Sequence, residues 1–444
     1  MSFRFPYSEL PVTTQLFVWS KITNAENPGS SLMPIFFQRV RLLSVVSMLT
    51  SFLPAIANAQ QSIRTPESPA FSALSANPQA SFITVGPFRG AANAGVGYSY
   101  TDNANTTEFN KLADNQFYES LGLGLSWPIS AFNQIDIALN GRLEEDFYSN
   151  GTNALNVEIL PGSQIRFQVE IGSVQVRAFE QFAIIQDPVA DPTASGQTNL
   201  NRLINTFGVS AAVPVGVMKL GFEVDYTYSS ALNGTPTGAG TQSVGDVRNS
   251  FRLASTIGFA ASPSLDYGLE ISATANTGAG PNDVNSLSIG PFIRGRLTQL
   301  IEVDAGTGLT IVDAPGLGPA QYYGYVSIRH HLSRVTQILL GVSHDLIFSD
   351  GLNLAKSNDF YLTLQTQLTP QVTCSVGPFV DFGRVISGEN PGSYTQYGVS
   401  AGSTFQLSRQ ITTAISYRFA RRDGADPSGR YIQNLFSLQF GYGF

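Results

Sequence analysis

The sequence is poor in charge, in cysteine and in histidine. Only 13% of its 444 residues are charged, about half of what an average soluble domain carries. Its single cysteine, Cys374, excludes an internal disulfide. The net charge is -7, so the chain lacks the basic surface with which proteins bind nucleic acid. These deficits argue against an ordinary soluble domain, a disulfide-stabilised fold and a nucleic-acid partner.

Long hydrophobic runs are also missing. In the predicted mature chain no stretch reaches 18 uninterrupted apolar residues, which is about the length that a membrane-spanning helix needs. Hydrophobic residues nevertheless make up an ordinary 43%, with 42 Gly, 30 Phe and 17 Tyr. Low charge combined with many glycines and aromatic residues favours a barrel in which half of every strand faces lipid.

One targeting segment is present. Arg39 and Arg41 form a positive n-region, residues 42–56 are mostly apolar, and residues 57–59 (Ala-Asn-Ala) have the small-x-small pattern of a cleavage site. We expect cleavage after Ala59, and no cysteine follows that would carry a lipid anchor. The pattern therefore predicts secretion of the chain out of the cytoplasm.

The sequence divides into three predicted parts. Residues 1–59 are an N-terminal extension plus the secretory signal peptide, and both Met1 and Met33 stay open as the true start. Residues 60–93 are rich in Pro, Ser and Ala and are predicted to form a periplasmic lead. Residues 94–444 are predicted to form one transmembrane β-barrel.

From residue 94 onward the chain alternates with a period of two. Because a strand points successive side chains to opposite faces, the run 436–444 has two unlike faces. One face is small or polar and the other is entirely apolar, the latter consisting of Phe436, Leu438, Phe440, Tyr442 and Phe444. Such a strand fits a barrel wall with lipid on one side and water on the other.

Similar runs are joined alternately by tight turns and longer polar loops. The tight turns are 128–134, 172–173, 214–217, 262–264, 298–300, 333–334, 369–370 and 408–409. The longer loops are 102–114, 146–154, 186–201, 229–249, 276–285, 313–320, 349–357, 386–393 and 422–429. These connections imply eighteen strands, with sixteen as the alternative.

Charged residues in these runs avoid the apolar parity. Residues 135–144, 164–171, 218–226 and 411–419 all place their charges on the opposite parity from Ile, Leu, Val and Phe. An Arg or Lys in the middle of the lipid would cost about 2–4 kcal/mol. A soluble β-sandwich also alternates, but eighteen strands with Gly and Ser on the polar face favour a large barrel with a lumen.

A few residues break the parity or mark its ends. Glu180 has apolar parity in mid-run, and three explanations stay open: a bulge that flips the register, a subunit contact, or protonation. Glu119, His344 and Arg384 share that parity, but they lie near loop ends, where lipid headgroups solvate them. The aromatic residues near run ends are assigned to interfacial belts: Trp127, Tyr228, Tyr322, Tyr394, Tyr431, Tyr442 and Phe444.

The C-terminal run resembles the closing strand of bacterial outer-membrane proteins, which ends in Phe. In that family the last strand is the signal read by the barrel assembly machinery, so the resemblance assigns this role to Phe440, Tyr442 and Phe444. With the signal peptide and the alternation, the chain is similar to Gram-negative outer-membrane β-barrel proteins of the porin class. The resemblance implies an all-β, antiparallel up-and-down barrel in the outer membrane, with periplasmic N- and C-termini.

Catalytic and metal-binding patterns are sparse. Ser343, His344 and Asp345 are adjacent in sequence, but neighbours on a strand face opposite sides and a catalytic triad needs spatial adjacency. The same geometry argues against metal binding by His330 and His331. We expect no enzyme activity, no cofactor and no metal.

The polar parity carries the functional candidates. Nine basic and twelve acidic residues have lumen parity, and some are expected to pair across strands. The pore-lining candidates are Arg142, Arg166, Arg177, Glu223, Asp225, Arg252, Asp266, Glu270, Arg294, Arg296, Glu302, Asp304, Arg329 and Arg418. The remaining lumen-parity charges are Asp136, Glu144, Asp146, Glu170, Lys219, Asp345 and Asp381.

The sequence therefore predicts a porin-like channel for passive diffusion of small hydrophilic solutes. Two other functions stay open: an export channel for a polysaccharide, and a non-conducting structural or adhesive barrel. The expected partners are outer-membrane lipid, the barrel assembly machinery and small hydrophilic solutes, and a homo-oligomer is left open. The sequence names no particular solute.

Overall fold

The computed structural model describes residues 83–130, 132–185, 202–232, 247–278, 283–314, 317–348, 354–387, 392–424 and 429–444. The predicted signal peptide, its cleavage site and residues 60–82 of the predicted lead lie outside the described residues. Within the described ranges, no helix is long and apolar enough to cross a membrane.

Twenty strands account for most of the described chain. In chain order they are β1 (Ile83–Val85), β2 (Phe88–Thr101), β3 (Asp114–Pro128), β4 (Gln134–Tyr148), β5 (Asn153–Ile159), β6 (Gln164–Ile171), β7 (Val174–Ile185), β8 (Arg202–Val215), β9 (Met218–Ala231), β10 (Val247–Ser262), β11 (Leu265–Gly278), β12 (Val284–Arg296), β13 (Ile301–Asp313), β14 (Ala320–His331), β15 (Thr336–Phe348), β16 (Leu354–Thr369), β17 (Val372–Ser387), β18 (Gly392–Gln406), β19 (Ile411–Gly424) and β20 (Tyr431–Gly443).

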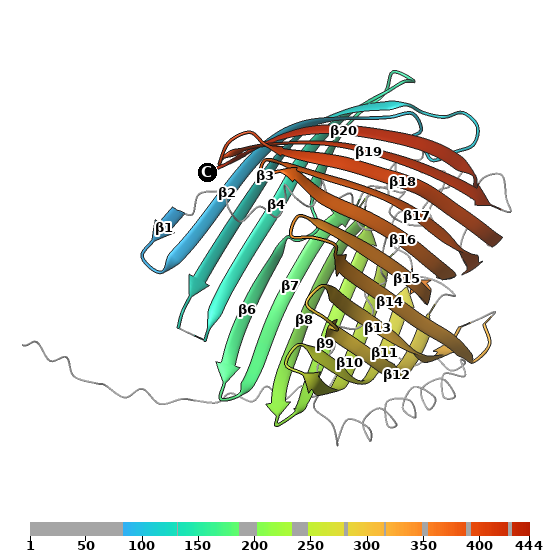
Figure 1. Cartoon of the computed structure of the whole chain (residues 1–444). Helices are drawn as coiled ribbons and strands as arrows, with labels where there is room; N and C mark the ends of the chain where they lie inside the picture. The colour runs from blue at the N-terminus through green and yellow to red at the C-terminus, as the bar shows by residue number, and fades with distance from the viewer. Residues whose placement is uncertain are drawn as a thin grey trace, which may run out of the picture. The chain divides into compact units, whose positions relative to one another are not determined.

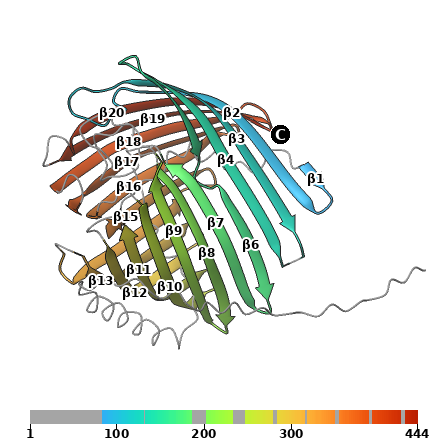
Figure 2. The same cartoon turned by 180° about the vertical axis from the view of Figure 1, so that it is seen from behind.

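The strands form a closed antiparallel barrel. From β2 onward the wall follows the chain, and β20 pairs antiparallel with β2 to close it (Figures 1 and 2). The short β1 pairs with β2 on the flank that β20 occupies further along, and β5 and β6 both pair with β4. Because β1 shares one position with β20, and β5 shares another with β6, the twenty strands fill eighteen positions in the wall. The predicted fold class and strand number are confirmed, and the sixteen-strand alternative is wrong.

The interruption between β5 and β6 was not predicted. Pro161 cannot donate a ladder hydrogen bond, and Gly162 adopts a φ of +94° that favours glycine. The buried Ser163 replaces the missing ladder bonds, since its hydroxyl accepts from the Asn140 amide at 2.9 Å and donates to the Leu160 carbonyl at 3.0 Å. One wall place is therefore built from two short strands joined by a kink.

The start of the wall also differs from the prediction. β2 begins at Phe88, six residues before the predicted boundary at residue 94. β1 and β2 form a hairpin whose turn contains Gly86 with a φ of +60°. The last residues of the predicted lead thus belong to the wall.

Cross-wall contacts identify which face of the sheet is concave. Lys219 of β9 reaches Asp266 of β11, past the intervening β10, and Tyr323 of β14 reaches Glu270 of β11, past two strands. Side chains can bridge over a neighbouring strand only on the inside of a curved wall. The parity of these residues is therefore inward, and the apolar parity is outward.

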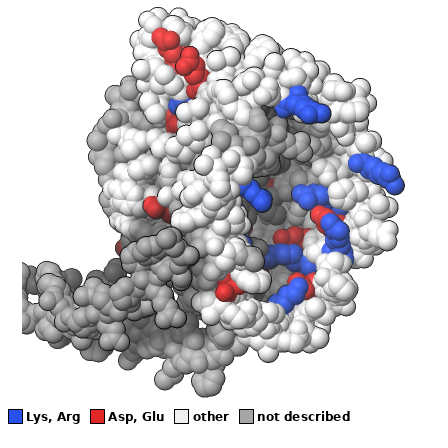
Figure 3. Space-filling view, turned by 90° about the vertical axis from the view of Figure 1, so that its left-hand side faces the viewer, with Lys and Arg blue, Asp and Glu red and all other residues white. Residues whose placement is uncertain are grey.

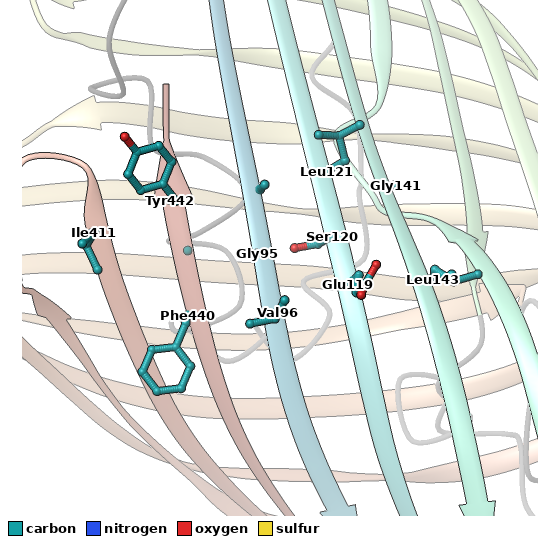
Figure 4. Close-up of a pocket in the computed structure, with 12 residues that line it drawn as sticks. Gly95, Val96, Glu119, Ser120, Leu121, Gly141, Leu143, Ile411, Phe440 and Tyr442 are labelled. Atoms are coloured by element: carbon teal, nitrogen blue, oxygen red, sulfur yellow. The ribbon is translucent and has the colours of Figure 1, made fainter.

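The outward face is mostly apolar. Phe207, Phe251, Leu309 and Phe382 are each about half exposed on it. Near the turn end, the Phe88 ring lies 5.1 Å from the Trp127 ring, in the position expected for an interfacial belt. Figure 4 shows the outward wall where β20, β2 and β3 meet, with a shallow pocket lined by Val96, Leu121, Leu143, Phe440 and Tyr442.

Two of the predicted belt residues, Tyr394 and Tyr431, face the inside of the barrel, so their assignment to a belt is wrong. Tyr394 pairs with Gly424 and Tyr431 pairs with Arg422, which is inward parity, and both rings are almost fully buried. Closeness to a loop end indicated a belt, but parity, which decides the face, was not applied to them. Tyr322, in contrast, is outward and 57% exposed.

Glu180 lies on the outward face without any bulge. Its register with β6 and β8 is continuous, so the explanation by a register flip is wrong. The Glu180 carboxylate accepts a hydrogen bond of 2.9 Å from the side-chain amide of Asn205, which is also outward. The chain thus provides one polar partner for this carboxylate, and the subunit contact and protonation both stay predictions.

Candidate channel lining

Charged side chains gather inside the barrel. Figure 3 looks into a hollow whose wall carries interspersed basic and acidic side chains. The strand register gives every pore-lining candidate the inward parity, from Arg142 on β4 to Arg418 on β19. That these side chains border a water path stays a prediction. Their ion pairs and hydrogen bonds divide them into groups.

The first group lies on β9, β10 and β11. Arg252 donates from its Nε to Asp225 at 2.8 Å, and its guanidinium also contacts the Glu223 carboxylate. Lys219 donates to both oxygens of Asp266, at 2.7 and 2.9 Å. One arginine from the next strand thus contacts both carboxylates of β9, as expected for opposite charges across an antiparallel pair.

The second group lies on β12, β13 and β14. Arg294 is directly opposite Asp304 in the register, with an Nε–Oδ2 distance of 2.9 Å. Glu302 accepts from two arginines, Arg296 at 3.0 Å and Arg329 at 3.2 Å. Asp304 therefore forms an ion pair with one arginine, whereas Glu302 forms ion pairs with two.

Glu270 belongs to this region but is held differently. It lies opposite Gly290, and its carboxylate accepts from the hydroxyl of Tyr323 at 3.3 Å and of Tyr325 at 3.4 Å. Both contacts are at the long end for hydrogen bonds. Two glycines beside these rings, Gly290 and Gly306, leave the space that the tyrosines occupy.

A third group lies on β3 to β6. Arg166 donates to Asp136 from two nitrogens, at 2.8 and 3.2 Å. Arg142 lies 4.8 Å above the Tyr118 ring and pairs with Glu144 at 2.5 Å and also with Glu158. Glu158 was not assigned to the lumen from the sequence, although it lies between the predicted loop 146–154 and turn 172–173 and has the parity of Arg166.

A fourth group on β15 to β19 was only partly predicted. Asp359 lies directly opposite Asp381, and the hydroxyl of Ser357 donates to both carboxylates. Arg422, which the sequence placed in a loop, is inward on β19 and lies 4.8 Å above the Tyr394 ring. Strict parity would have found Asp359, since it alternates with the outward Phe360. Arg422 could not be assigned to the lumen from the sequence, because the predicted strand ended before it, whereas β19 extends to Gly424.

Arg177 stands out among the candidates. It is exposed on the inward face of β7, and it makes no ion pair with any of the described residues. The other basic residues of the first three groups each have a carboxylate partner. Without a direct ion pair, the charge of Arg177 is partly balanced at longer range by the Glu223 carboxylate on β9.

The three histidines do not come together. His330 is outward and His331 inward at the turn end of β14, while His344 is outward near the loop end. His344 stacks on Tyr322 and shares a 2.7 Å hydrogen bond with Asn358. Ser343 and Asp345 point to the opposite face from His344. Among the described residues, no group of three His, Cys, Asp or Glu side chains is arranged to hold a metal.

Comparison with known proteins finds similarity only among solved structures. No protein-family model and no curated protein matches the chain. OccAB3 of Acinetobacter baumannii is 8% identical, with 81% of this chain and 100% of that chain covered and a TM-score of 0.47. OccK7 (OpdD) of Pseudomonas aeruginosa is 8% identical, with 80% and 99% covered and a TM-score of 0.46. The outer membrane protein opdK of Pseudomonas aeruginosa is 9% identical, with 80% and 99% covered and a TM-score of 0.44.

Proposed function

We propose that this chain is a porin-like channel of the Gram-negative outer membrane, through which small hydrophilic solutes diffuse passively. One observation carries the proposal: an eighteen-place closed wall has an apolar outward face and a charged inward face. A barrel of this size has more interior than its side chains fill. Lipid outside and water inside satisfy both faces at once.

The orientation in the membrane follows from the connections. Short turns are periplasmic and longer loops are external in bacterial barrels. Both β1 and the C-terminal Phe444 lie at the turn end, since the Phe444 amide donates to the Ala92 carbonyl at 2.8 Å. We infer periplasmic termini, with lipid and the barrel assembly machinery as partners, and we leave the homo-oligomer open.

Solute uptake into vesicles tests the proposal against its two alternatives. Purified protein is reconstituted into liposomes, and swelling is followed in sugars of graded size. A small-solute channel admits mono- and disaccharides and excludes polysaccharides. Swelling in a polysaccharide would favour an export channel, and no swelling in any sugar would favour a structural or adhesive barrel.

Removing two lumen arginines is expected to change ion preference. In Arg294→Ala/Arg296→Ala, Asp304 loses its cation, so cation selectivity should rise. Arg294→Ala alone should account for most of the shift, because Glu302 keeps Arg329 when Arg296 is removed. Reversal potentials across a salt gradient measure this, and the shift should shrink in 1 M salt, where the screening length is about 3 Å.

The matched control is Arg334→Ala/Arg409→Ala, which removes the same charge from two exposed turns. It should leave the reversal potential near the wild-type value. An open channel whose reversal potential does not respond to loss of Arg294 and Arg296 would show that these arginines lie away from the permeation path.

A further inference from the structure

Two basic residues face each other on the outward wall. Lys356 on β16 and Arg384 on β17 are direct partners in the antiparallel register. Their parity is that of Phe360 and Phe382, which are exposed on the outward face. Directly opposed side chains in an antiparallel pair lie within about 5.5 Å at Cβ, where like charges destabilise the pair.

Among the described residues, no acidic side chain next to this pair compensates it. Across the strands, the outward neighbours are Leu346, opposite Lys356, and Ser393, opposite Arg384. Neither Lys356 nor Arg384 forms an ion pair with any described residue. The chain thus holds two opposed cations on its outer surface without a counter-ion among the residues described.

Another outward arginine shows the usual solution. Arg421 on β19 has Asp423 two residues away on the same strand and face, at 3.0 Å. That pair is neutral by itself. The contrast indicates that the charge of Lys356 and Arg384 is neutralised by something outside the described chain.

The position of the pair along the wall restricts what that group can be. Going toward the loop end, Phe360 is followed on the outward face by Asn358 and then by Lys356, and Phe382 is followed by Arg384. Asn358 bonds His344, which stacks on Tyr322, so a polar and aromatic belt lies at the same end. Such a belt marks the level of the lipid headgroups, and Lys356 and Arg384 lie directly beyond the apolar band.

We propose that Lys356 and Arg384 bind the phosphate group of an anionic lipid in the leaflet next to the loops. A guanidinium presents paired N–H donors that match phosphate oxygens, and an ammonium adds a second charge-assisted donor. The acyl chains would lie along the apolar band that includes Phe360 and Phe382. This site goes beyond solute passage and does not require an open lumen.

The test measures lipid binding by native mass spectrometry of detergent-purified protein. The probes are phosphatidic acid, phosphatidylcholine and inorganic phosphate. Lys356→Gln/Arg384→Gln should weaken phosphatidic acid binding about 30-fold, equivalent to about 2 kcal/mol for two basic side chains at an anionic membrane surface. Phosphatidylcholine should bind both proteins equally weakly, because its headgroup has no net charge.

The control variant Arg334→Gln/Arg409→Gln removes the same charge at the opposite end of the barrel and should bind phosphatidic acid like wild type. The heat-dependent gel mobility of each variant verifies that it is folded. Equal losses in the two double variants would overturn the proposal, as a general charge effect. Competition by inorganic phosphate as strong as that by the lipid would also overturn it, in favour of a free-anion site.

Discussion

Leu139→Arg is expected to destabilise the inserted barrel by about 2–4 kcal/mol, the cost of a basic side chain at the middle of the lipid. Leu139 is 41% exposed on the outward face of β4, opposite Leu123 of β3. It lies midway between Ile135, near the turn, and Leu143, toward the loop. Urea-dependent unfolding from lipid vesicles measures the loss.

The adjacent residue provides the matched control. Ala138 is inward on the same strand, opposite Gly124, which has no side chain for a longer residue to clash with. Ala138→Arg should therefore fold with nearly wild-type stability. Equal losses at Leu139 and Ala138 would contradict the assignment of faces, and a larger loss at Ala138 would reverse it.

Deleting Phe444 is expected to slow assembly strongly while leaving the assembled barrel nearly as stable as before. The ring is 48% exposed and packs edge-on against Tyr442 at 4.9 Å. Loss of that contact and of one terminal hydrogen bond costs about 1–2 kcal/mol. A recognition role predicts a much larger effect on insertion, because the machinery would lose its terminal aromatic residue. Pulse-chase assembly in cells follows the rate, and unfolding of purified barrel follows the stability.

Phe436→Ala separates recognition from the general loss of a ring. Phe436 is outward on the same strand, but it lies near the middle of β20, away from the C-terminus, and is 40% exposed. Its loss should lower stability by a similar amount without slowing assembly. Normal assembly of the Phe444 deletion, or equal slowing in both variants, would refute the assembly role of the C-terminal residue.

Much of the wall could be predicted because a barrel strand needs only an alternating pattern and a turn. The run 218–226 became β9 with Lys219, Glu223 and Asp225 all inward, as expected. Every charge that was assigned to the lumen by parity has inward register. A closed wall leaves each side chain only two directions, so one correct residue fixes the parity of its whole strand.

Other features depend on information beyond a single strand. The pairing of Lys219 with Asp266 bridges over β10 and requires the curvature of the wall. The kink at Pro161 and Gly162 depends on Ser163 replacing ladder bonds to β4. The hydroxyl of the buried Tyr394 donates a hydrogen bond of 3.2 Å to the Asp381 carboxylate on the neighbouring strand. Each of these follows from a cross-strand partner, which alternation alone does not identify.

A passive channel requires that the inside of this barrel is a continuous water path. The most direct test is the electrical conductance of the purified full-length protein in a planar lipid bilayer. A water-filled lumen should give discrete, repeated current steps that scale with the salt concentration and persist in the Arg334→Ala/Arg409→Ala control. Folded, inserted barrels that give no current steps would contradict the claim and show that the lumen is closed.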